Sequence, residues 1–203
     1  MTRIAIVIAI AYLVGAIPTS YWVVRAVKGI DLRTVGSGNL GATNAYRQLG
    51  APLAVAIALF DIAKGAFPVL VLAPWAGLGP VGAVLLGMVA VIGHAFSLFV
   101  GFRGGKGVAT GGGVILGLAP LAWLVCAGVW ALVTRLTGFV SLASIVAALA
   151  LPPAVLFLDA SARPALPLVM LLSAAIIFMH RSNIIRLVRG TESRFGRKAQ
   201  VAP

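Results

Sequence analysis

Residues 66–102 read AFPVLVLAPWAGLGPVGAVLLGMVAVIGHAFSLFVGF, and none of these 37 residues is Asp, Glu, Lys or Arg. A single helix of that length would be roughly 55 Å long, whereas the hydrocarbon core of a bilayer is about 30 Å thick. Pro and Gly interrupt the run at residues 74–80, which read PWAGLGP and are typical of a turn. The stretch therefore predicts two membrane-crossing helices joined by an uncharged turn.

Similar uncharged stretches continue on both sides of this hairpin. They cover Ile4–Val24, Val108–Thr134, Leu136–Leu158 and Pro164–Met179. Of the 203 residues, 61% are hydrophobic and only 10% are charged, which is too few charges for the surface of a soluble domain. No repeat and no low-complexity linker divides the chain. We therefore expect an all-α polytopic membrane protein with a single integral membrane domain over residues 1–203.

The distribution of basic residues indicates which helix ends face the cytoplasm. The formal net charge is +12, and twelve of the 16 Lys and Arg residues lie in Arg25–Arg47, Arg103–Lys106 and Arg181–Lys198. Such concentrations mark cytoplasmic segments, and we expect no nucleic-acid partner because the charge is not carried on a soluble domain. One crossing per apolar stretch would leave the last basic segment outside, so we expect Val108–Thr134 to fold back near Pro120. This predicts about seven transmembrane or half-membrane helices, with the N-terminus outside and the C-terminus inside.

A first candidate site lies in residues 35–47, which read VGSGNLGATNAYR. Glycines leave backbone N–H groups open to an anion, and Ser, Thr, Asn and Arg side chains add donors. The glycines formally match G-x-G-x-x-G, but no strand precedes them, so we exclude a dinucleotide-binding fold. A flexible turn between spans is the simpler alternative, and it would rarely need so many polar donors. We predict a phosphate-binding segment formed by Gly36, Ser37, Gly38, Asn39, Thr43, Asn44 and Arg47.

A second candidate site lies in residues 101–113, which read GFRGGKGVATGGG and include seven glycines. A P-loop is excluded, because Val100 stands where its first glycine is needed and Gly107 where Ser or Thr must follow the lysine. The simpler alternative is a cytoplasmic loop whose glycines pack helices. Because glycine permits close approach of the backbone to a ligand, we predict a second phosphate-binding segment formed by Arg103, Gly104, Gly105, Lys106 and Gly107.

A third candidate site, residues 180–192, follows the last apolar stretch and reads HRSNIIRLVRGTE. On a helix, His180, Asn183 and Arg186 would share one face. A basic helix end bound to anionic lipid headgroups would explain the arginines, but it explains His180 and Asn183 poorly. Glu192 is the only acidic residue of this region, and we expect it to pair with a neighbouring Arg.

Other polar residues of the spans have simpler interpretations. His94 is as consistent with a packed, hydrogen-bonded histidine as with a catalytic one. Asp61 and Lys64 are expected to neutralise each other inside the bundle, and Ser141 is expected to hold helices together. Cys126 is alone in the sequence and is interpreted as a packing residue.

The three segments, in this order, resemble the motifs of the bacterial acyl-phosphate:glycerol-3-phosphate acyltransferases known as PlsY. The matching patterns are G-S-G-N-L-G-A-T-N-x-x-R, G-x-R-G-G-K-G-V-A-T and H-R-x-N-I-x-R-L-x-x-G-T-E, and the resemblance covers essentially the whole chain. It implies a seven-helix protein of the bacterial cytoplasmic membrane, with the active site facing the cytoplasm. The implied reaction transfers the acyl group of a fatty acyl phosphate to the 1-hydroxyl of glycerol 3-phosphate, giving lysophosphatidic acid and orthophosphate.

The resemblance also implies roles for individual residues. Ser37, Lys106, His180 and Asn183 are the implied catalytic core, and His94, Ser141 and Glu192 support it. The substrate phosphates would be bound by Gly36, Ser37, Gly38, Asn39, Thr43, Asn44, Arg47, Arg103, Gly104, Gly105, Lys106, Gly107 and Arg186. An acyl phosphate already carries a good leaving group, so we expect no metal and no cofactor. The partners are then the two substrates and membrane lipid, and we expect a monomer.

The implied reaction leaves one proton without an assigned acceptor. Either His180 or an oxygen of the acyl phosphate could take it from the attacking hydroxyl. We favour the phosphate oxygen, because a weak base suffices against so reactive a carbonyl.

Three other classes of membrane protein are less consistent with the sequence. A transporter of anions predicts a basic site near the membrane midplane within repeated helices, and no repeat is visible. A CDP-alcohol phosphotransferase needs clustered Asp residues, but the chain has four acidic residues in all. Acyltransferases with a His-x4-Asp pair are excluded, because Phe99 and Ile185 stand at that spacing after the two histidines.

Overall fold

The computed structural model describes residues 2–195 and contains helices and connecting segments, without strands, over that range. Six helical runs are long and apolar enough to cross a membrane: Thr2–Lys28, Ala51–Trp75, Pro80–Val100, Pro120–Thr137, Val140–Leu158 and Ala160–Met179. Val108–Leu118 is a shorter apolar helix. The prediction of an all-α membrane protein with about seven transmembrane or half-membrane helices is confirmed. Arg197 and Lys198, at the end of the third basic segment, lie outside the described residues.

The first span is broken at Pro18 into α1 (Thr2–Ala16) and α2 (Thr19–Lys28). Proline has no N–H to donate, so a helix usually kinks or ends there. The carbonyls freed by the break are bound by side chains from other parts of the chain. Ser97 Oγ donates to the Ala16 carbonyl, and Lys64 Nζ donates to the Ile17 carbonyl over 2.9 Å.

The quoted stretch of residues 66–102 forms the predicted hairpin. Its first arm is the end of α4 (Ala51–Phe67), the π-helical turn η1 (Pro68–Leu72) and α5 (Ala73–Trp75), where Pro68 accounts for the wider turn. Its second arm, α6 (Pro80–Ala95), ends before the uncharged stretch does, because the chain turns at Phe96 and continues into the 3-10 turn η2 (Leu98–Val100).

The expected fold-back of Val108–Thr134 is present at Ala119. This residue is extended (φ −145°, ψ 74°) and separates α7 (Val108–Leu118) from α8 (Pro120–Thr137), because the residue before a proline disfavours helical geometry. With 11 residues, α7 spans roughly 16 Å, or about half of the hydrocarbon core. The remaining elements are α3 (Ala42–Leu49), α9 (Val140–Leu158), η3 (Ala160–Ala165), α10 (Leu166–Met179) and α11 (Arg181–Val188).

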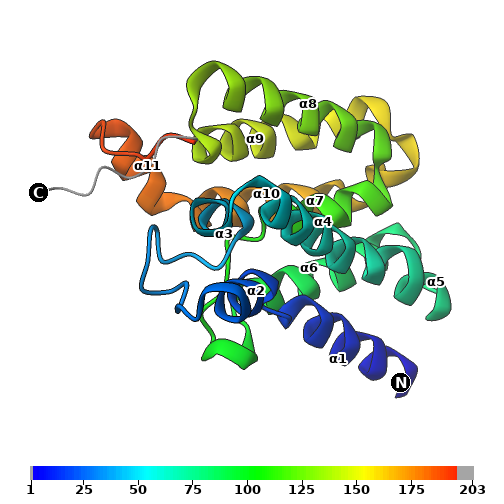
Figure 1. Cartoon of the computed structure of the whole chain (residues 1–203). Coiled ribbons are helices and arrows are strands. Elements are labelled where there is room, and N and C mark those ends of the chain that lie inside the picture. Colours follow the sequence, from blue (N-terminus) through cyan, green and yellow to red (C-terminus); the bar gives the residue numbers. More distant parts are fainter. Residues whose placement is uncertain (1, 196–203) are drawn as a thin grey trace, which may run out of the picture.

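The bundle is built from closely packed helix pairs, chiefly α1 with α6, α4 with α7, and α8 with α9 (Figure 1). In the α4–α7 pair the two backbones touch through glycines. A Cβ added at Gly65 would overlap the carbonyl oxygen of Thr110, and one added at Gly113 would overlap that of Ile62. Small residues at such contacts are the usual device for packing helices in a membrane, where no hydrophobic driving force acts between them.

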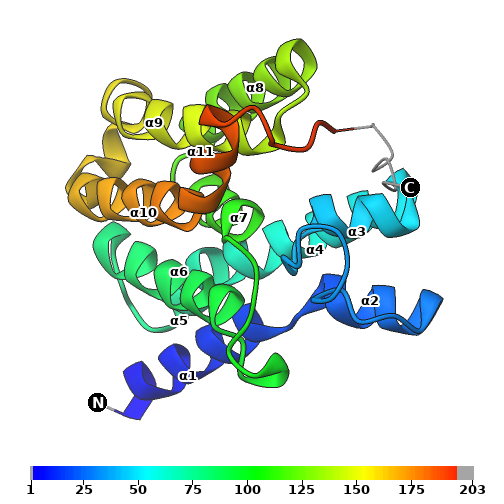
Figure 2. The ribbon, with the colours of Figure 1, turned by 90° about the vertical axis from the view of Figure 1, so that its left-hand side faces the viewer.

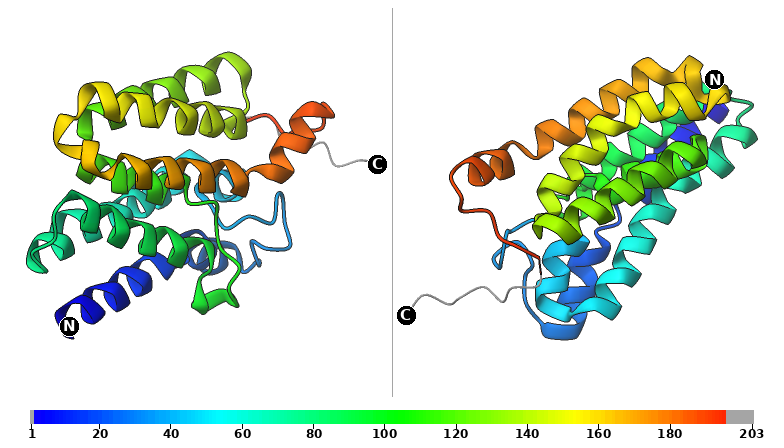
Figure 3. Two further views of the ribbon diagram at one scale, coloured as in Figure 1. Left: turned by 180° about the vertical axis from the view of Figure 1, so that it is seen from behind. Right: turned by 90° about the horizontal axis from the view of Figure 1, so that it is seen from above.

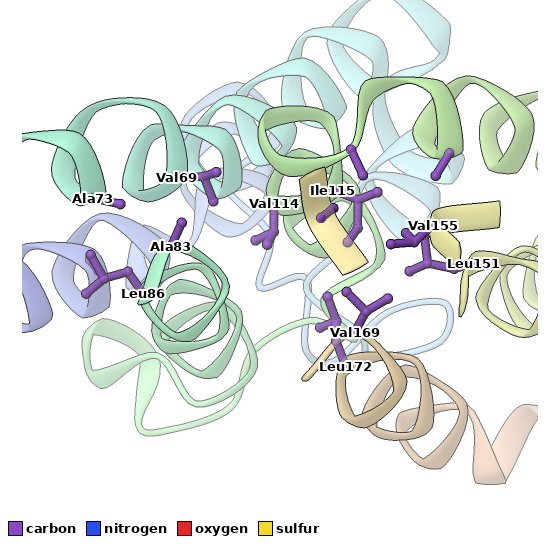
Figure 4. Packing of buried hydrophobic residues seen from close by; sticks show 14 of the residues in the cluster. Val69, Ala73, Ala83, Leu86, Val114, Ile115, Leu151, Val155, Val169 and Leu172 are labelled. Carbon is purple, nitrogen blue, oxygen red and sulfur yellow. The ribbon is translucent and has the colours of Figure 1, made fainter. Parts of the chain in front are cut away.

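The half-length helix α7 lies at the centre of the main core. Figure 4 shows its residues Val114 and Ile115 within a group of apolar side chains from several helices. The group includes Val69, Ala83, Leu86, Leu151, Val155, Val169 and Leu172. Beside this core, the side chains of Lys64 and Asp61 form a buried ion pair with 2.7 Å between Nζ and Oδ1, so the prediction that these two residues neutralise each other is confirmed.

The glycine contact between α4 and α7 generates a stability prediction. Gly113→Ala should lower the thermal unfolding midpoint in detergent, because the new Cβ pushes against the Ile62 carbonyl. Overpacking of this kind costs about 1–3 kcal/mol of stability. The higher helix propensity of Ala, worth roughly 1 kcal/mol, offsets only part of that cost. Gly128→Ala on α8 is the matched control, since no atom lies within 4 Å of its added Cβ. The control should keep or raise the midpoint, and equal behaviour of both variants would contradict the proposed contact.

Candidate active site

The three candidate segments gather at one end of the bundle. In Figure 1 the connection between α2 and α3, the connection between α6 and α7, and helix α11 lie at the end opposite the N-terminus and α5. Figure 3 shows the same separation from behind and from above. The fold-back at Ala119 makes this possible, because α7 and α8 together begin and end on the side where α11 emerges.

The first segment is folded around the side chain of Asn44. Its Nδ2 donates to the carbonyls of Leu32 and Val35 over 3.2 and 3.0 Å, and its Oδ1 accepts the N–H of Ser37 over 3.2 Å. Gly36 has a φ of +58° and passes so close to this amide that a Cβ would overlap Oδ1. Asn44 is 1% exposed, so its side chain shapes the segment while Ser37 stays exposed at its tip.

The short helix α3 begins at the end of this segment. Its N-cap Gly41 is extended and supplies no side chain to the free N–H groups of the first turn, which leaves a helix N-terminus suited to an anion. Thr43 lies in this first turn, and Arg47 lies in the last turn. Arg47 is half-buried, and within residues 2–195 its guanidinium makes no hydrogen bond or ion pair.

Arg33, just before the first segment, contacts Val100, just before the second. Its Nη1 donates to the Val100 carbonyl over 3.3 Å, while Nη2 and Oδ2 of Asp31 are 2.6 Å apart. The hydrogen bonds from Arg33 lower the pKa of Asp31 to about 2, so the pair is ionised. Beneath it, Leu32 and Val100 belong to a second apolar cluster with Val24, Leu40, Ala45 and Ile57.

The second segment lies against the end of α6 and is pressed onto His94. A Cβ at Gly104 would overlap the His94 carbonyl, and one at Gly105 would overlap the His94 ring. The N–H of Gly105 donates to the same carbonyl over 3.1 Å. His94 is 7% exposed, so the structure places it as a support beneath the glycines. Arg103 is exposed at the surface of the segment.

Lys106, Asn183 and Glu192 form a chain of contacts across the second and third segments. Lys106 Nζ donates to Asn183 Oδ1, and Asn183 Nδ2 donates to Glu192 Oε1 over 2.7 Å. Ser141 Oγ donates to the same carboxylate oxygen, and Arg186 Nε to the other, each over 2.7 Å. The predicted ion pair of Glu192 with an Arg is confirmed, and Ser141 ties α9 to the site.

His180 lies at the junction of α10 and α11 and is 3% exposed. Its Nδ1 is 2.8 Å from the Ile176 carbonyl oxygen, so Nδ1 carries the hydrogen and Nε2 is left as an acceptor. Burial lowers the pKa of His180 below its ordinary value. The ring is therefore neutral near pH 7 and can accept a proton or a hydrogen bond.

The charges of the site favour an anion. Burial, together with Arg186 and Arg47, lowers the pKa of Lys106 to about 8, while Glu192 opposes the shift. Lys106, Arg186 and Arg47, which come from separate elements, are therefore close enough to influence one another's charge. Burial alone would raise the pKa of Glu192, but hydrogen bonds from Ser141, Asn183 and Arg186 lower it. One carboxylate faces several cations, which leaves the site net positive.

An apolar groove of about 190 Å³ includes Lys106 in its lining. It runs between α6 and α10 and is lined by Val91, Ile92, Ala95, Phe96, Lys106, Ala175, Ile176, Phe178 and Met179. An apolar groove of this kind, with the Lys106 side chain in its wall, suits an acyl chain. Within residues 2–195, no three His, Cys, Asp or Glu side chains come together as metal ligands would.

Sequence reasoning missed the groove and one aromatic contact. The groove residues are indistinguishable in sequence from any lipid-facing positions, since only the packing of α6 against α10 separates them. The rings of Tyr46 and Phe195 are stacked with centroids 4.4 Å apart, and neither residue stands in a pattern that predicts a partner.

Comparison with known proteins places these segments in a family. Residues 5–190 match the family model described as glycerol-3-phosphate acyltransferase. A glycerol-3-phosphate acyltransferase of Geobacter metallireducens is 47% identical over 193 residues, which cover 94% of this chain and 96% of the relative. One from Fusobacterium nucleatum is 43% identical over 188 residues, covering 93% and 96%.

Solved structures of PlsY (YgiH), an integral membrane glycerol 3-phosphate acyltransferase, have the same fold. The glycerol 3-phosphate form has a TM-score of 0.86 and 37% identity, covering 95% of this chain and 96% of that chain. The lysophosphatidic acid form has a TM-score of 0.85 and 36% identity, covering 95% of each. The chain therefore belongs to the glycerol-3-phosphate acyltransferase family, as its three motifs suggest.

Proposed function

We propose that this protein transfers the acyl group of a fatty acyl phosphate to the 1-hydroxyl of glycerol 3-phosphate, which yields 1-acyl-glycerol 3-phosphate and orthophosphate. The observation that carries the proposal is the position of Lys106. Its side chain helps to line the apolar groove, and its amine belongs to the network of Asn183 and Glu192. A lipid-borne anion and a water-soluble one can meet at that point. The family's name and the two ligand forms of its solved members support the acceptor and the product.

The donor would lie with its acyl chain in the groove and its phosphate near Lys106. The backbone of Gly104–Gly107 and the exposed Arg103 lie beside that position, although the N–H of Gly105 is already bound to the His94 carbonyl. Attack of the hydroxyl forms a new C–O bond to the acyl carbon, and the C–O bond to the phosphate breaks. Lys106 then offsets charge on the departing orthophosphate, which is electrostatic stabilisation of the kind that lowers barriers most.

The acceptor phosphate would lie between the first and third segments. We assign it to Arg47 and Arg186, with Ser37, Asn39, Thr43 and the backbone of Gly36 and Gly38 as further donors. Asn44 acts indirectly, because its amide is already engaged with Leu32, Val35 and Ser37. Asn183 orients the glycerol and Ser141 and Glu192 hold Asn183 in place, since Glu192 accepts from both.

We assign the proton of the attacking hydroxyl to an oxygen of the acyl phosphate. A mixed anhydride is reactive enough for a weak base to suffice. The phosphate group of the donor is bonded to the reacting acyl carbon, so its oxygens lie beside the attacking hydroxyl. His180 presents its unprotonated Nε2 in the same region, so it can orient the hydroxyl. No metal and no cofactor takes part, and a single chain supplies every group named here.

We place the site on the cytoplasmic face of the bacterial inner membrane, with the N-terminus outside. The basic segments support this orientation, because Lys and Arg concentrate on cytoplasmic loops. In spheroplasts, a membrane-impermeant maleimide should label Gly79→Cys in the outer turn. It should not label Arg135→Cys until the membrane is opened, and the reverse order of labelling would contradict the orientation.

The proposed reaction is tested with purified protein in a lipid mesophase. Orthophosphate should be released from palmitoyl phosphate only when glycerol 3-phosphate is present, with lysophosphatidic acid formed in equal amount. The activity should persist in EDTA. Orthophosphate release that does not require glycerol 3-phosphate, or uptake of either anion without turnover, would refute the proposed reaction.

The phosphate contacts generate a prediction for two cations. Lys106→Ala and Arg47→Ala should each lower kcat/KM by at least about 100-fold, the usual cost of removing a group that stabilises developing charge, while the variants remain folded. Arg163→Ala, in the turn between α9 and α10 at the opposite end of the bundle, is the control and should stay near the parent value. Near-parent activity of either site variant would remove that residue from the phosphate contacts.

The pKa of Lys106 generates a prediction for the alkaline limb of activity. Lys106 is a cation below its pKa of about 8, so kcat/KM should fall as the pH rises through that value. Glu192→Gln should move this limb to lower pH, because the Glu192 charge raises the pKa of Lys106. Asp159→Asn removes a carboxylate at the opposite end of the bundle and should leave the limb unmoved. If the alkaline fall in kcat/KM occurred at the same pH in Glu192→Gln as in the parent, Lys106 would be ruled out as the titrating group.

A further inference from the structure

The tail after α11 is fixed across the corner between α8 and α9. Glu192 is held there by Ser141. Three residues later, the N–H of Phe195 donates to the Gly138 carbonyl over 2.7 Å. Between these two contacts, the Arg194 guanidinium lies over the Phe139 ring at 5.2 Å. The tail therefore follows a defined path over this corner up to Phe195.

From this corner the ring of Phe195 reaches another part of the molecule. It stacks on Tyr46 of α3, with 4.4 Å between ring centroids and 23° between ring planes. Figure 2 shows the tail running from α11 past α8 toward α3. The helices packed against α3 are α4 and α2, so the stack joins α3 to the half of the protein that holds α8, α9 and α11.

This joint lies next to a residue of the proposed site. Arg47 follows Tyr46 directly on α3, whereas Asn183 and Glu192 lie on the other side of the joint. Arg47 is close enough to lower the pKa of Lys106, yet it makes no hydrogen bond or ion pair within residues 2–195. Its distance from Lys106 therefore depends on where α3 is held.

We propose that Tyr46 and Phe195 form an aromatic clasp whose task is to position Arg47 for the phosphate of glycerol 3-phosphate. The inference rests on the proposed function, in which Arg47 binds that phosphate. It is specific for the acceptor substrate, because the groove assigned to the acyl chain is lined by Lys106 but not by Arg47 or any residue of α3. Tyr46 and Phe195 are thus positioning residues and contact neither substrate.

The clasp is tested by measuring KM for each substrate separately. Tyr46→Ala and Phe195→Ala should each raise KM for glycerol 3-phosphate by roughly two- to tenfold, the range expected for loss of one aromatic pair. KM for palmitoyl phosphate and kcat should stay at the parent values. The double variant should be no worse than either single variant, because both remove the same interaction.

Two controls separate positioning from general damage. Tyr46→Phe keeps the ring and should restore the low KM, and Phe157→Ala removes another exposed ring, on α9, and should leave both KM values unchanged. Hydrogen exchange of the Phe195 amide should become faster in Tyr46→Ala, which reports loosening of the tail without reference to activity.

Three outcomes would overturn the clasp: an unchanged KM for glycerol 3-phosphate, a parallel rise in both KM values, or additive effects of the two substitutions. Failure of the proposed function is recognised separately. In that case the parent protein itself would not form lysophosphatidic acid from these substrates, while faster exchange of the Phe195 amide in Tyr46→Ala would still report the contact.

Discussion

The contact between α4 and α7 is the constraint on which the arrangement of the site depends. The two backbones meet at Gly65 and Gly113, where a single added carbon would overlap a carbonyl of the other helix. Because α7 is only 11 residues long, it cannot anchor itself across the bilayer, and this contact determines where it lies. Lys106 stands two residues before α7 begins, so the same contact determines the depth of the amine. The Pro120 break then returns the chain and brings α11 to the same end.

The site that results works with donors and cations. Glu192 is its only carboxylate within the described residues of the network, and the carboxylate is occupied by Ser141, Asn183 and Arg186. It organises donors and is not free to act as a base. Such a site matches the two anionic substrates of the proposed reaction, one of which already carries a leaving group. In the proposed reaction, the protein holds both anions together and offsets the charge on the departing phosphate.

Much of this could be predicted from the sequence because membranes impose strong patterns. Uncharged stretches predicted the spans. Prolines predicted the breaks at residues 74–80 and 120, and the basic segments predicted that three distant motifs share one surface. The role of Asn44 could not be predicted, since an amide that binds a phosphate and one that folds a loop look alike in sequence. The early end of α6 at Ala95, the groove beside it and the stack of Tyr46 on Phe195 depend on how helices pack, and apolar residues carry no pattern that distinguishes a groove from a lipid-facing wall.

The central claim is that the three segments bind one pair of anions at one place. A structure determined in lipid mesophase with glycerol 3-phosphate tests it most directly. The phosphate should lie in hydrogen-bonding contact with Arg47, and the glycerol hydroxyls should face Asn183, His180 and Lys106. A phosphate bound at the exposed Arg103 or Arg181, without contact to Arg47, would contradict this arrangement.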